Sequence, residues 1–230
     1  MADRIIGLEN ASRTLSGGAR VLHEVDLELR AGESLAIVGR SGSGKSTLLS
    51  CLGLLAPFDR GTSYHLGDTE IMSLSERSAA RLRATSIGFV LQNSGLVAHL
   101  SALENVELPL MHSSSDGFRD IRRRAFEQLD LLDIGHLARR RPAQVSGGER
   151  QRIAIARALV IGPRLILADE PTGALDEQTG ALVLDLMLDL VHRTAAAMIV
   201  VTHDSDVSSR ADRTLHVSEG RLHERERRTR

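Results

Sequence analysis

The sequence has a single cysteine, few aromatic residues and no long apolar run. Cys51 alone cannot form a disulfide within the chain, which fits a reducing compartment. The purest apolar stretch, Ala195–Val201, is seven residues long, far short of the ~20 that a membrane-spanning helix needs. Nothing at the N-terminus resembles a signal peptide. If the protein works at a membrane, another component has to hold it there.

Excess charge of either sign is also absent, because the 230 residues carry a formal net charge of −1 at pH 7. This balance gives no support for nucleic-acid binding by bulk electrostatics, so no nucleic-acid partner is expected. The arginine runs at 122–124 and 139–141 are interpreted as solvated faces. The length fits one large domain or one domain with an inserted lobe.

The most informative segment is rich in glycine and lies between a short apolar run, residues 35–38, and a predicted buried helix. Strand, glycine-rich turn and helix in this order are the context of a P-loop. Glycines allow successive N–H groups to point at phosphate oxygens, and the helix N-terminus adds its own N–H groups and dipole. Lys45 supplies a charge for the outer phosphates, and the Ser46 hydroxyl can ligate Mg²⁺. The predicted nucleotide-binding residues here are Gly39, Ser41, Gly42, Ser43, Gly44, Lys45, Ser46 and Thr47.

Further polar residues follow other predicted buried strands. Gln92 ends the run 87–91 and can reach a metal or water, although a glutamine there also fits an ordinary loop. Asp169 and Glu170 end the run 164–168; they fit a solvated turn or, together with a P-loop, a metal-holding aspartate and a water-activating glutamate. His203 ends the run 198–202 and is either a solvated or capping residue or part of the same site.

A second glycine pair opens a predicted helix at residues 145–151. Ser146 and Glu149 have the spacing of a capping box, which alone would explain both residues. It does not explain Gly147 and Gly148 between them, because adjacent glycines cost helix stability. Free N–H groups beside these glycines would form a second anion site.

Taken together, these segments resemble the ATPase subunit of an ATP-binding cassette (ABC) transporter over nearly the whole chain. The resemblance rests on six motifs in order. They are Walker A (Gly39–Thr47), the Q-loop (Gln92), the signature (Val145–Gln151), Walker B (Leu165–Glu170), the D-loop (Gly173–Asp176) and the switch histidine (His203). The signature separates the chain from P-loop kinases and GTPases, which share only the Walker elements.

Residues 87–92, 100–110 and 168–176 are similar to the branch of the family that contains macrolide-export, lipoprotein-release and cell-division ATPases. Members of that branch pair with permeases that have few membrane helices and a large ectodomain. The resemblance therefore implies an integral membrane permease as partner, and a peripheral location on the cytoplasmic face of the cell membrane through that permease.

The implied fold is α/β: a P-loop NTPase core with a mainly parallel sheet flanked by helices, an N-terminal antiparallel β subdomain and an inserted α-helical subdomain. One nucleotide-binding domain would span residues 1–230. Residues 1–92 and 161–220 would form the RecA-like core with the β subdomain, residues 93–160 the helical subdomain, and residues 221–230 a flexible tail.

The implied activity is ATP hydrolysis with Mg²⁺ in a head-to-tail dimer with a second copy or a paralogous ATPase. Lys45, Glu170 and His203 would be catalytic, and Ser46, Gln92 and Asp169 would hold the metal. Residues that the resemblance assigns to the nucleotide outside Walker A are Gln92, Ser146, Gly147, Gly148 and Asp176.

Two positions depart from the family pattern. Family members usually carry an aromatic residue near the N-terminus that stacks on adenine, and the matching position here is Leu15. Apolar contact would replace stacking, so we expect weaker affinity or adenine preference. Glu149 replaces the usual glutamine of the signature; it serves the capping box equally well and adds a negative charge near the predicted γ-phosphate contact. We expect this charge to be tolerated.

Three functions remain open from the sequence. The chain can power export or extraction of a substrate, or it can transmit force to an extracytoplasmic partner as the cell-division branch does. The third is a soluble ABC ATPase acting on DNA or ribosomes. The neutral charge, the single cassette and the lack of a coiled-coil insertion disfavour this third function.

Overall fold

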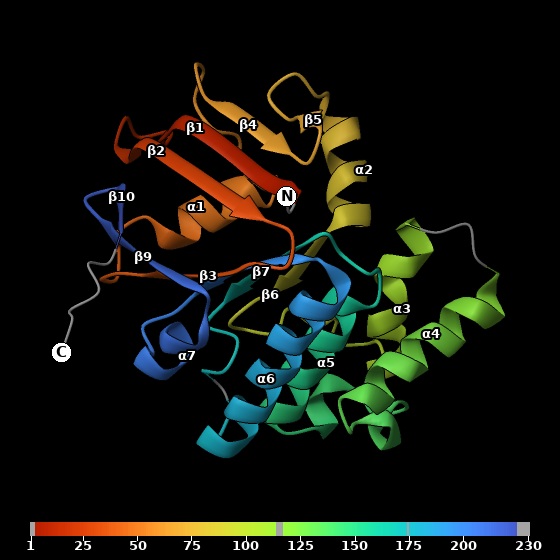
Figure 1. The fold of residues 1–230 in the computed structure, drawn as a ribbon. Coiled ribbons are helices and arrows are strands. Elements are labelled where there is room, and N and C mark those ends of the chain that lie inside the picture. The colour runs from red at the N-terminus through yellow and green to blue at the C-terminus, as the bar shows by residue number, and fades with distance from the viewer. Residues whose placement is uncertain (1–2, 114–116, 174, 225–230) are drawn as a thin grey trace.

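Two β-sheets lie on opposite sides of helix α1 (Lys45–Leu52) in the computed structural model, which describes residues 3–113, 117–173 and 175–224 (Figure 1). The smaller sheet is antiparallel and has the strand order β2-β1-β4-β5. Its strands are β1 (Arg4–Thr14), β2 (Arg20–Arg30), β4 (Ser63–Leu66) and β5 (Thr69–Glu70).

The larger sheet has the order β10-β9-β3-β8-β7-β6, in which all neighbours are parallel except the edge strand β10. Its strands are β3 (Ser34–Val38), β6 (Ile87–Val90), β7 (Leu165–Asp169), β8 (Ala197–Val201), β9 (Arg213–Ser218) and β10 (Arg221–Glu224).

Helices cover the other face of this larger sheet (Figure 1). They come mainly from the segment between β6 and β7, where the sequence predicts an inserted helical subdomain. The remaining helices are α2 (Glu76–Ser86), α3 (Ala102–Ser113), α4 (Phe118–Leu131), α5 (Gly147–Leu159), α6 (Glu177–Thr194) and α7 (Ser205–Arg210), with 3₁₀ turns at Gly135–Leu137 and Pro142–Gln144.

The alternation of side chains along the central strands explains the layers. Leu35 and Ile37 of β3 pack with α1 and the antiparallel sheet, whereas Ala36 between them packs with the helices. Successive strand residues point to opposite faces, so a strand covered on both sides is apolar throughout. In β2, by contrast, Val25, Leu27 and Leu29 are buried and the acidic residues between them are exposed.

The predicted fold class is confirmed, but its C-terminal end differs from the prediction. Residues 221–224 were predicted as part of a flexible tail, whereas they form β10 and pair with β9. These strands are short, charged and half-exposed, so their sequence lacks an apolar run. The rest of the predicted tail, 225–230, lies outside the described residues, and the subdomain boundaries stay a prediction. Within the described ranges, no helix is both long and apolar enough to cross a bilayer.

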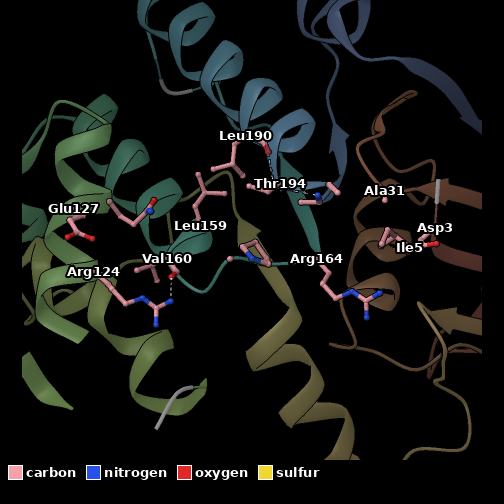
Figure 2. Close-up of a pocket in the computed structure, with 15 residues that line it drawn as sticks. Asp3, Ile5, Ala31, Arg124, Glu127, Leu159, Val160, Arg164, Leu190 and Thr194 are labelled. Atoms are coloured by element: carbon pink, nitrogen blue, oxygen red, sulfur yellow. Dashed lines mark hydrogen bonds between the residues drawn. The ribbon is translucent and has the colours of Figure 1, made fainter. Parts of the chain in front are cut away.

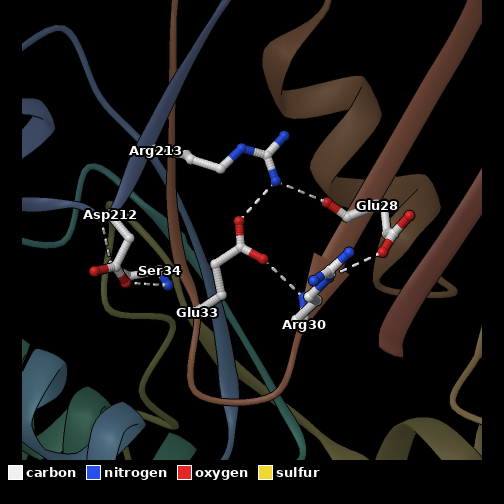
Figure 3. A network of polar contacts seen from close by, with 6 residues as sticks. All are labelled: Glu28, Arg30, Glu33, Ser34, Asp212 and Arg213. Carbon is white, nitrogen blue, oxygen red and sulfur yellow. Dashed lines mark hydrogen bonds and ion pairs between the residues drawn. The ribbon is translucent and has the colours of Figure 1, made fainter. Parts of the chain in front are cut away.

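A polar network fixes the start of β3, the strand that leads into the P-loop (Figure 3). The backbone N–H and hydroxyl of Ser34, which is fully buried, donate to Asp212 Oδ2 at 2.8 and 2.6 Å, and the Asp212 N–H donates back to Ser34 Oγ. One residue away, Arg213 Nη1 donates to Glu33 Oε1 at 2.7 Å. These contacts join the β2–β3 turn to the start of β9.

The Asp212 carboxylate is expected to stabilise the fold at neutral pH and to lose this effect in acid. Burial disfavours its ionised form, but hydrogen bonds from Ser34 and the nearby His192 outweigh burial and lower the pKa of Asp212 below its ordinary value of 3.8. A lowered folded-state pKa means that stabilisation is present above the unfolded pKa of about 4 and is lost as the pH falls through the folded pKa.

We therefore expect Asp212→Asn to lower the thermal midpoint at pH 7 by about 2 °C. The difference from wild type should shrink below about pH 4. Glu28→Gln, which removes only an exposed ion pair with Arg30, is the control and should change the midpoint by less than about 1 °C. A difference for Asp212→Asn that stays constant into acid would contradict the role of the carboxylate charge.

Candidate functional site

The carboxyl ends of β3, β6, β7 and β8 surround a pocket of about 410 Å³ beside the P-loop. Parallel strands end at one edge of their sheet, so residues far apart in sequence meet there. Most of the residues predicted for the site line this pocket. The lining comprises Val21, Gly39, Ser41, Gly42, Gly44, Lys45, Ser46, Thr47, Gln92, Asp169, Glu170, Val201 and His203.

The loop before α1 can take its shape only with glycine at two positions. A Cβ on Gly39 would lie 2.4 Å from the carbonyl oxygen of Val217, and one on Gly44, at φ +104°, would lie 2.8 Å from that of Val21. Lys45 Nζ donates to the carbonyl oxygens of Gly39 and Arg40 at 2.8 and 2.9 Å. The ammonium group is therefore folded back over its own loop, where an anion held by the loop would meet it.

The residues present fit a nucleotide phosphate group. Ser43 Oγ is buried in the loop without a hydrogen-bond partner, and a Cβ on Gly42 would meet no atom within 4 Å, which leaves open space there. Exposed N–H groups at the start of α1 add donors and the positive end of the helix dipole.

Next to this loop, Ser46 Oγ donates to Asp169 Oδ2 at 3.3 Å. Burial raises the pKa of Asp169, and the neighbouring Glu170 adds to this, while the Ser46 hydroxyl and Lys45 oppose it. A hydroxyl and a carboxylate are hard oxygen ligands of the type that Mg²⁺ binds, with substrate phosphates supplying others. The predicted pair for the metal therefore lies together, and Gln92 lines the same pocket.

Glu170 is held by three donors at the end of β7. His203 contributes its N–H at 3.1 Å and its Nδ1 at 2.6 Å to Oε1, and the Thr202 hydroxyl donates to Oε2 at 3.1 Å. Glu170 has φ +47°, an uncommon conformation for a non-glycine residue that frequently occurs at functional sites. The sequence prediction included Glu170 and His203 but missed Thr202. Its position between a buried strand and His203 was the available signal.

The second predicted anion site lies elsewhere on the chain. Ser146, Gly147 and Gly148 start α5 and do not line the pocket. The capping box is present, since Glu149 N–H donates to Ser146 Oγ at 3.2 Å and Ser146 N–H donates to Glu149 Oε2 at 2.7 Å. These hydrogen bonds lower the pKa of Glu149, so its carboxylate is turned back onto the cap.

The predicted D-loop lies beside the start of α5. A Cβ on Gly148 would lie 3.1 Å from Leu175 Cδ2. Asp176 caps α6 by accepting the Thr179 N–H at 3.0 Å and is also absent from the pocket lining. Ala174, within the predicted D-loop, lies outside the described residues.

Another pocket, of about 510 Å³, lies away from the P-loop, where α4, α5 and α6 approach the start of β7 (Figure 2). None of the predicted site residues lines it. Arg124 reaches from α4 beside this pocket and donates to the Val160 carbonyl oxygen at 3.1 Å, just beyond α5.

The fold and the pocket beside Lys45 define a P-loop nucleotide-binding protein. A protein-family model described as "ABC transporter" matches residues 22–173. The chain belongs to the ABC transporter family and is an ATP-binding ATPase cassette of that family.

Relatives agree with the branch inferred from the sequence. The chain is 46% identical over 202 residues to the lipoprotein-releasing system ATP-binding protein LolD of Pseudomonas fluorescens, covering 88% of each chain. It is 42% identical over 221 residues to the macrolide export ATP-binding/permease protein MacB of Brucella abortus, covering 95% of this chain and 34% of that protein. A dimeric, post-hydrolysis structure of the ATP-binding cassette MJ0796 bound to ADP and Pi matches with a TM-score of 0.90 and 35% identity, over 98% of this chain and 100% of that one.

The contact between Glu170 and His203 gives a testable titration. The hydrogen bond from His203 to Glu170 and the attraction between the two charges raise the pKa of His203 above its ordinary value of 6.5. In an NMR pH titration of the nucleotide-free protein, the His203 signal should therefore titrate above 6.5, and Glu170→Gln should return it toward that value. Glu177→Gln, on the exposed start of α6, is the control. If the pKa of His203 is the same in the Glu170→Gln variant as in the wild type, the contact does not exist in solution.

Proposed function

We propose that two copies of this chain, or the chain and a paralogue, pair head to tail, hydrolyse ATP between them and drive a membrane permease. The observation that carries this proposal is the division of the site. One pocket gathers Lys45, Asp169 and Glu170, whereas the Ser146–Gly148 segment lies at the start of another helix and leaves that pocket open. A second copy can supply the missing donors. MJ0796, at 35% identity, is described as dimeric and bound to ADP and Pi.

Within one copy the roles follow from position and charge. Lys45 and the loop N–H groups bind the phosphates, and Ser46, Asp169 and Gln92 would hold Mg²⁺, which neutralises phosphate charge when bound. Glu170 accepts a proton from, or orients, the attacking water, and His203 contacts the γ-phosphate. Glu170 and His203 are hydrogen-bonded to each other, so the imidazole orients the carboxylate at the end of β7.

The partner copy contributes donors rather than charge. Ser146 Oγ already accepts the Glu149 N–H, so its own O–H proton is available to a phosphate oxygen. The N–H groups beside Gly147 and Gly148 at the helix start add to it. Asp176 stays near the interface through its cap on α6. The capped orientation of Glu149 supports our expectation that its negative charge is tolerated.

The permease is proposed to dock in an apolar groove of about 430 Å³ between α2, β6 and α3. Leu55, Phe89, Leu108 and Pro109 line it, and Leu55 is 57% exposed, so the groove offers apolar side chains to a partner. The relative MacB is described as an ATP-binding/permease protein, which supports a permease as the occupant. Association through this groove would place the chain at the inner face of a membrane.

Export or extraction is the proposed use of the energy. Among the relatives, MacB, at 42% identity, is named for macrolide export and LolD, at 46%, for lipoprotein release, which supports this use. The permease and its ectodomain would select the substrate.

Glu170→Gln tests the reaction and the partner together. We expect this variant to keep ATP binding and to lose turnover by about 10³-fold or more, because it removes the carboxylate that acts on water but keeps the side-chain size. Turnover close to that of wild type would overturn the role of Glu170. With ATP present, the tagged variant should form a stable dimer and should capture an integral membrane permease from detergent-solubilised native membranes.

The groove variant Leu55→Asp, which introduces a negative charge, is the control for that capture experiment, since it should keep the dimer and lose the permease. Recovery of ribosomal or DNA-bound proteins instead would overturn the transporter function and leave the ATPase chemistry intact. A permease captured without any transported substrate would favour force transmission over export.

Leu15 tests how the adenine is bound. Leu15 lies in the β1–β2 turn, is 43% exposed and is not part of the pocket lining, whereas Val21 of the next strand is. A tyrosine at position 15 should stack on the base and tighten ATP binding about fivefold. Binding can be followed by ATP protection of Lys45, the only lysine in the sequence, from an amine-specific reagent. Leu131→Tyr, on the exposed end of α4, is the matched control, and equal effects of the two variants would place the base elsewhere.

A further inference from the structure

The loop that carries Gln92 is attached to helix α5 by two side chains, the half-buried Arg157 and the buried Gln151. Arg157 Nη1 donates to the carbonyl oxygen of Gly95 at 2.7 Å, and its Nη2 donates to that of Ser94 at 2.8 Å. Gln151, on the same helix and 1% exposed, donates from Nε2 to the carbonyl oxygen of Leu91 at 3.4 Å. The segment 91–95 is thus hydrogen-bonded to α5 on both sides of Gln92.

The geometry favours an arginine at position 157. Ser94 and Gly95 have φ of +53° and +57°, and left-handed backbone is unfavourable for a serine. Their two carbonyl oxygens receive the two terminal nitrogens of one guanidinium group. Burial lowers the pKa of Arg157. Within the described ranges, the Arg157 guanidinium donates hydrogen bonds to carbonyl oxygens and pairs with no carboxylate. A planar fork matches two such acceptors, whereas a lysine ammonium acts as a point charge.

Helix α5 joins this loop to the second half of the proposed site. Gly147 and Gly148 form its first turn and Arg157 lies in its last, so about 15 Å of the 13-residue helix separates them. The close packing of Leu175 against Gly148, which leaves little room for a side chain there, and the capping box fix the first turn. A displacement of one end of this short helix therefore moves the other end.

We propose that Arg157 is a positioning residue that holds Gln92 on α5, so that the metal site of one copy and the Ser146–Gly148 segment it offers to its partner move as one body. This inference rests on the proposed function, because that function assigns Gln92 to Mg²⁺ and Ser146–Gly148 to the second nucleotide. Arg157 also lines the proposed docking groove, so a partner in the groove would contact the same connection.

The test is a double-mutant cycle of Arg157→Lys and Gln92→Ala in the purified full-length chain. Arg157→Lys should lower kcat about tenfold and leave KM for ATP within about twofold, because one of two charge-assisted hydrogen bonds is lost while the P-loop is untouched. The Mg²⁺ concentration for half-maximal activity should rise. In the Gln92→Ala background the lysine substitution should add little, because both changes act through the same side chain.

Independent, multiplicative losses in the cycle would overturn the inference, as would a loss confined to KM for ATP. Arg124→Lys is the matched control: Arg124 also donates to a backbone carbonyl oxygen next to α5 but far from the Gln92 loop. It should leave kcat and the Mg²⁺ dependence unchanged. If Arg157→Lys does not fold, Gln151→Met removes the link to Leu91 and should change the same parameters in the same direction by a smaller factor.

A readout without turnover keeps this test separate from the proposed function. The Mg²⁺ concentration needed for ATP to protect Lys45 should rise in Arg157→Lys, and amide hydrogen exchange should accelerate in residues 91–95 but not in β3. If a permease is captured but the effects of Arg157→Lys and Gln92→Ala are independent, the transporter function would stand and the role of Arg157 would be removed. If the effects of the two substitutions are coupled but no permease is captured, the role of Arg157 would stand and the transporter function would be removed.

Discussion

The site depends first on how closely the backbone approaches itself after β3. Gly39 and Gly44 lie so close to the carbonyl oxygens of Val217 and Val21 that neither position has room for a Cβ. Strands β9 and β2, which carry these carbonyl groups, therefore define the shape of the P-loop. A side chain at either glycine would push the loop off these strands and move Lys45 away from the carbonyl groups that orient it. The Ser34–Asp212 network at the other end of β3 fixes the same strand. The two sheets and the network therefore together determine the position of the Lys45 ammonium group. Lys45 is the only lysine of this sequence.

Adjacent carboxylates at the end of β7 are placed in different surroundings, and this difference separates their proposed roles. Asp169 faces the Ser46 hydroxyl, and burial disfavours its ionised form. A divalent cation beside it would stabilise the ionised carboxylate and so offset the unfavourable effect of burial. Glu170 turns the other way, with its oxygens bonded by Thr202 and His203. These hydrogen bonds orient the carboxylate, and Oε2, which among the described residues accepts only from Thr202, keeps a lone pair that can accept a proton from water.

Much of this could be predicted from the sequence, because the information is local. Short apolar runs followed at once by Gln92, Asp169 or His203 mark the ends of buried strands, and parallel strands bring such ends together. The confirmed α/β fold follows from the same runs. The strand β10 was missed because Leu222 is the only large apolar residue of residues 221–224. Arg157 was missed for another reason: a long side chain on an amphipathic helix can reach many places, and its partner Gly95 lies 62 residues away. The left-handed backbone at Glu170 has no sequence signal for a glutamate.

The charge at the start of α5 shows how the two halves of the site constrain each other. The capping box needs an acceptor at position 149, and glutamate supplies it as well as glutamine does, with its charge favoured by the helix dipole. The same helix end is proposed to meet the phosphates of the partner copy, where a negative charge is unfavourable. The cap resolves part of this conflict, because Oε2 of Glu149 is directed to the Ser146 N–H and the donors at Gly147 and Gly148 stay exposed. In the proposed dimer, Lys45 and Mg²⁺ of the facing copy would offset the remaining repulsion, so its closure would depend on both nucleotide and metal.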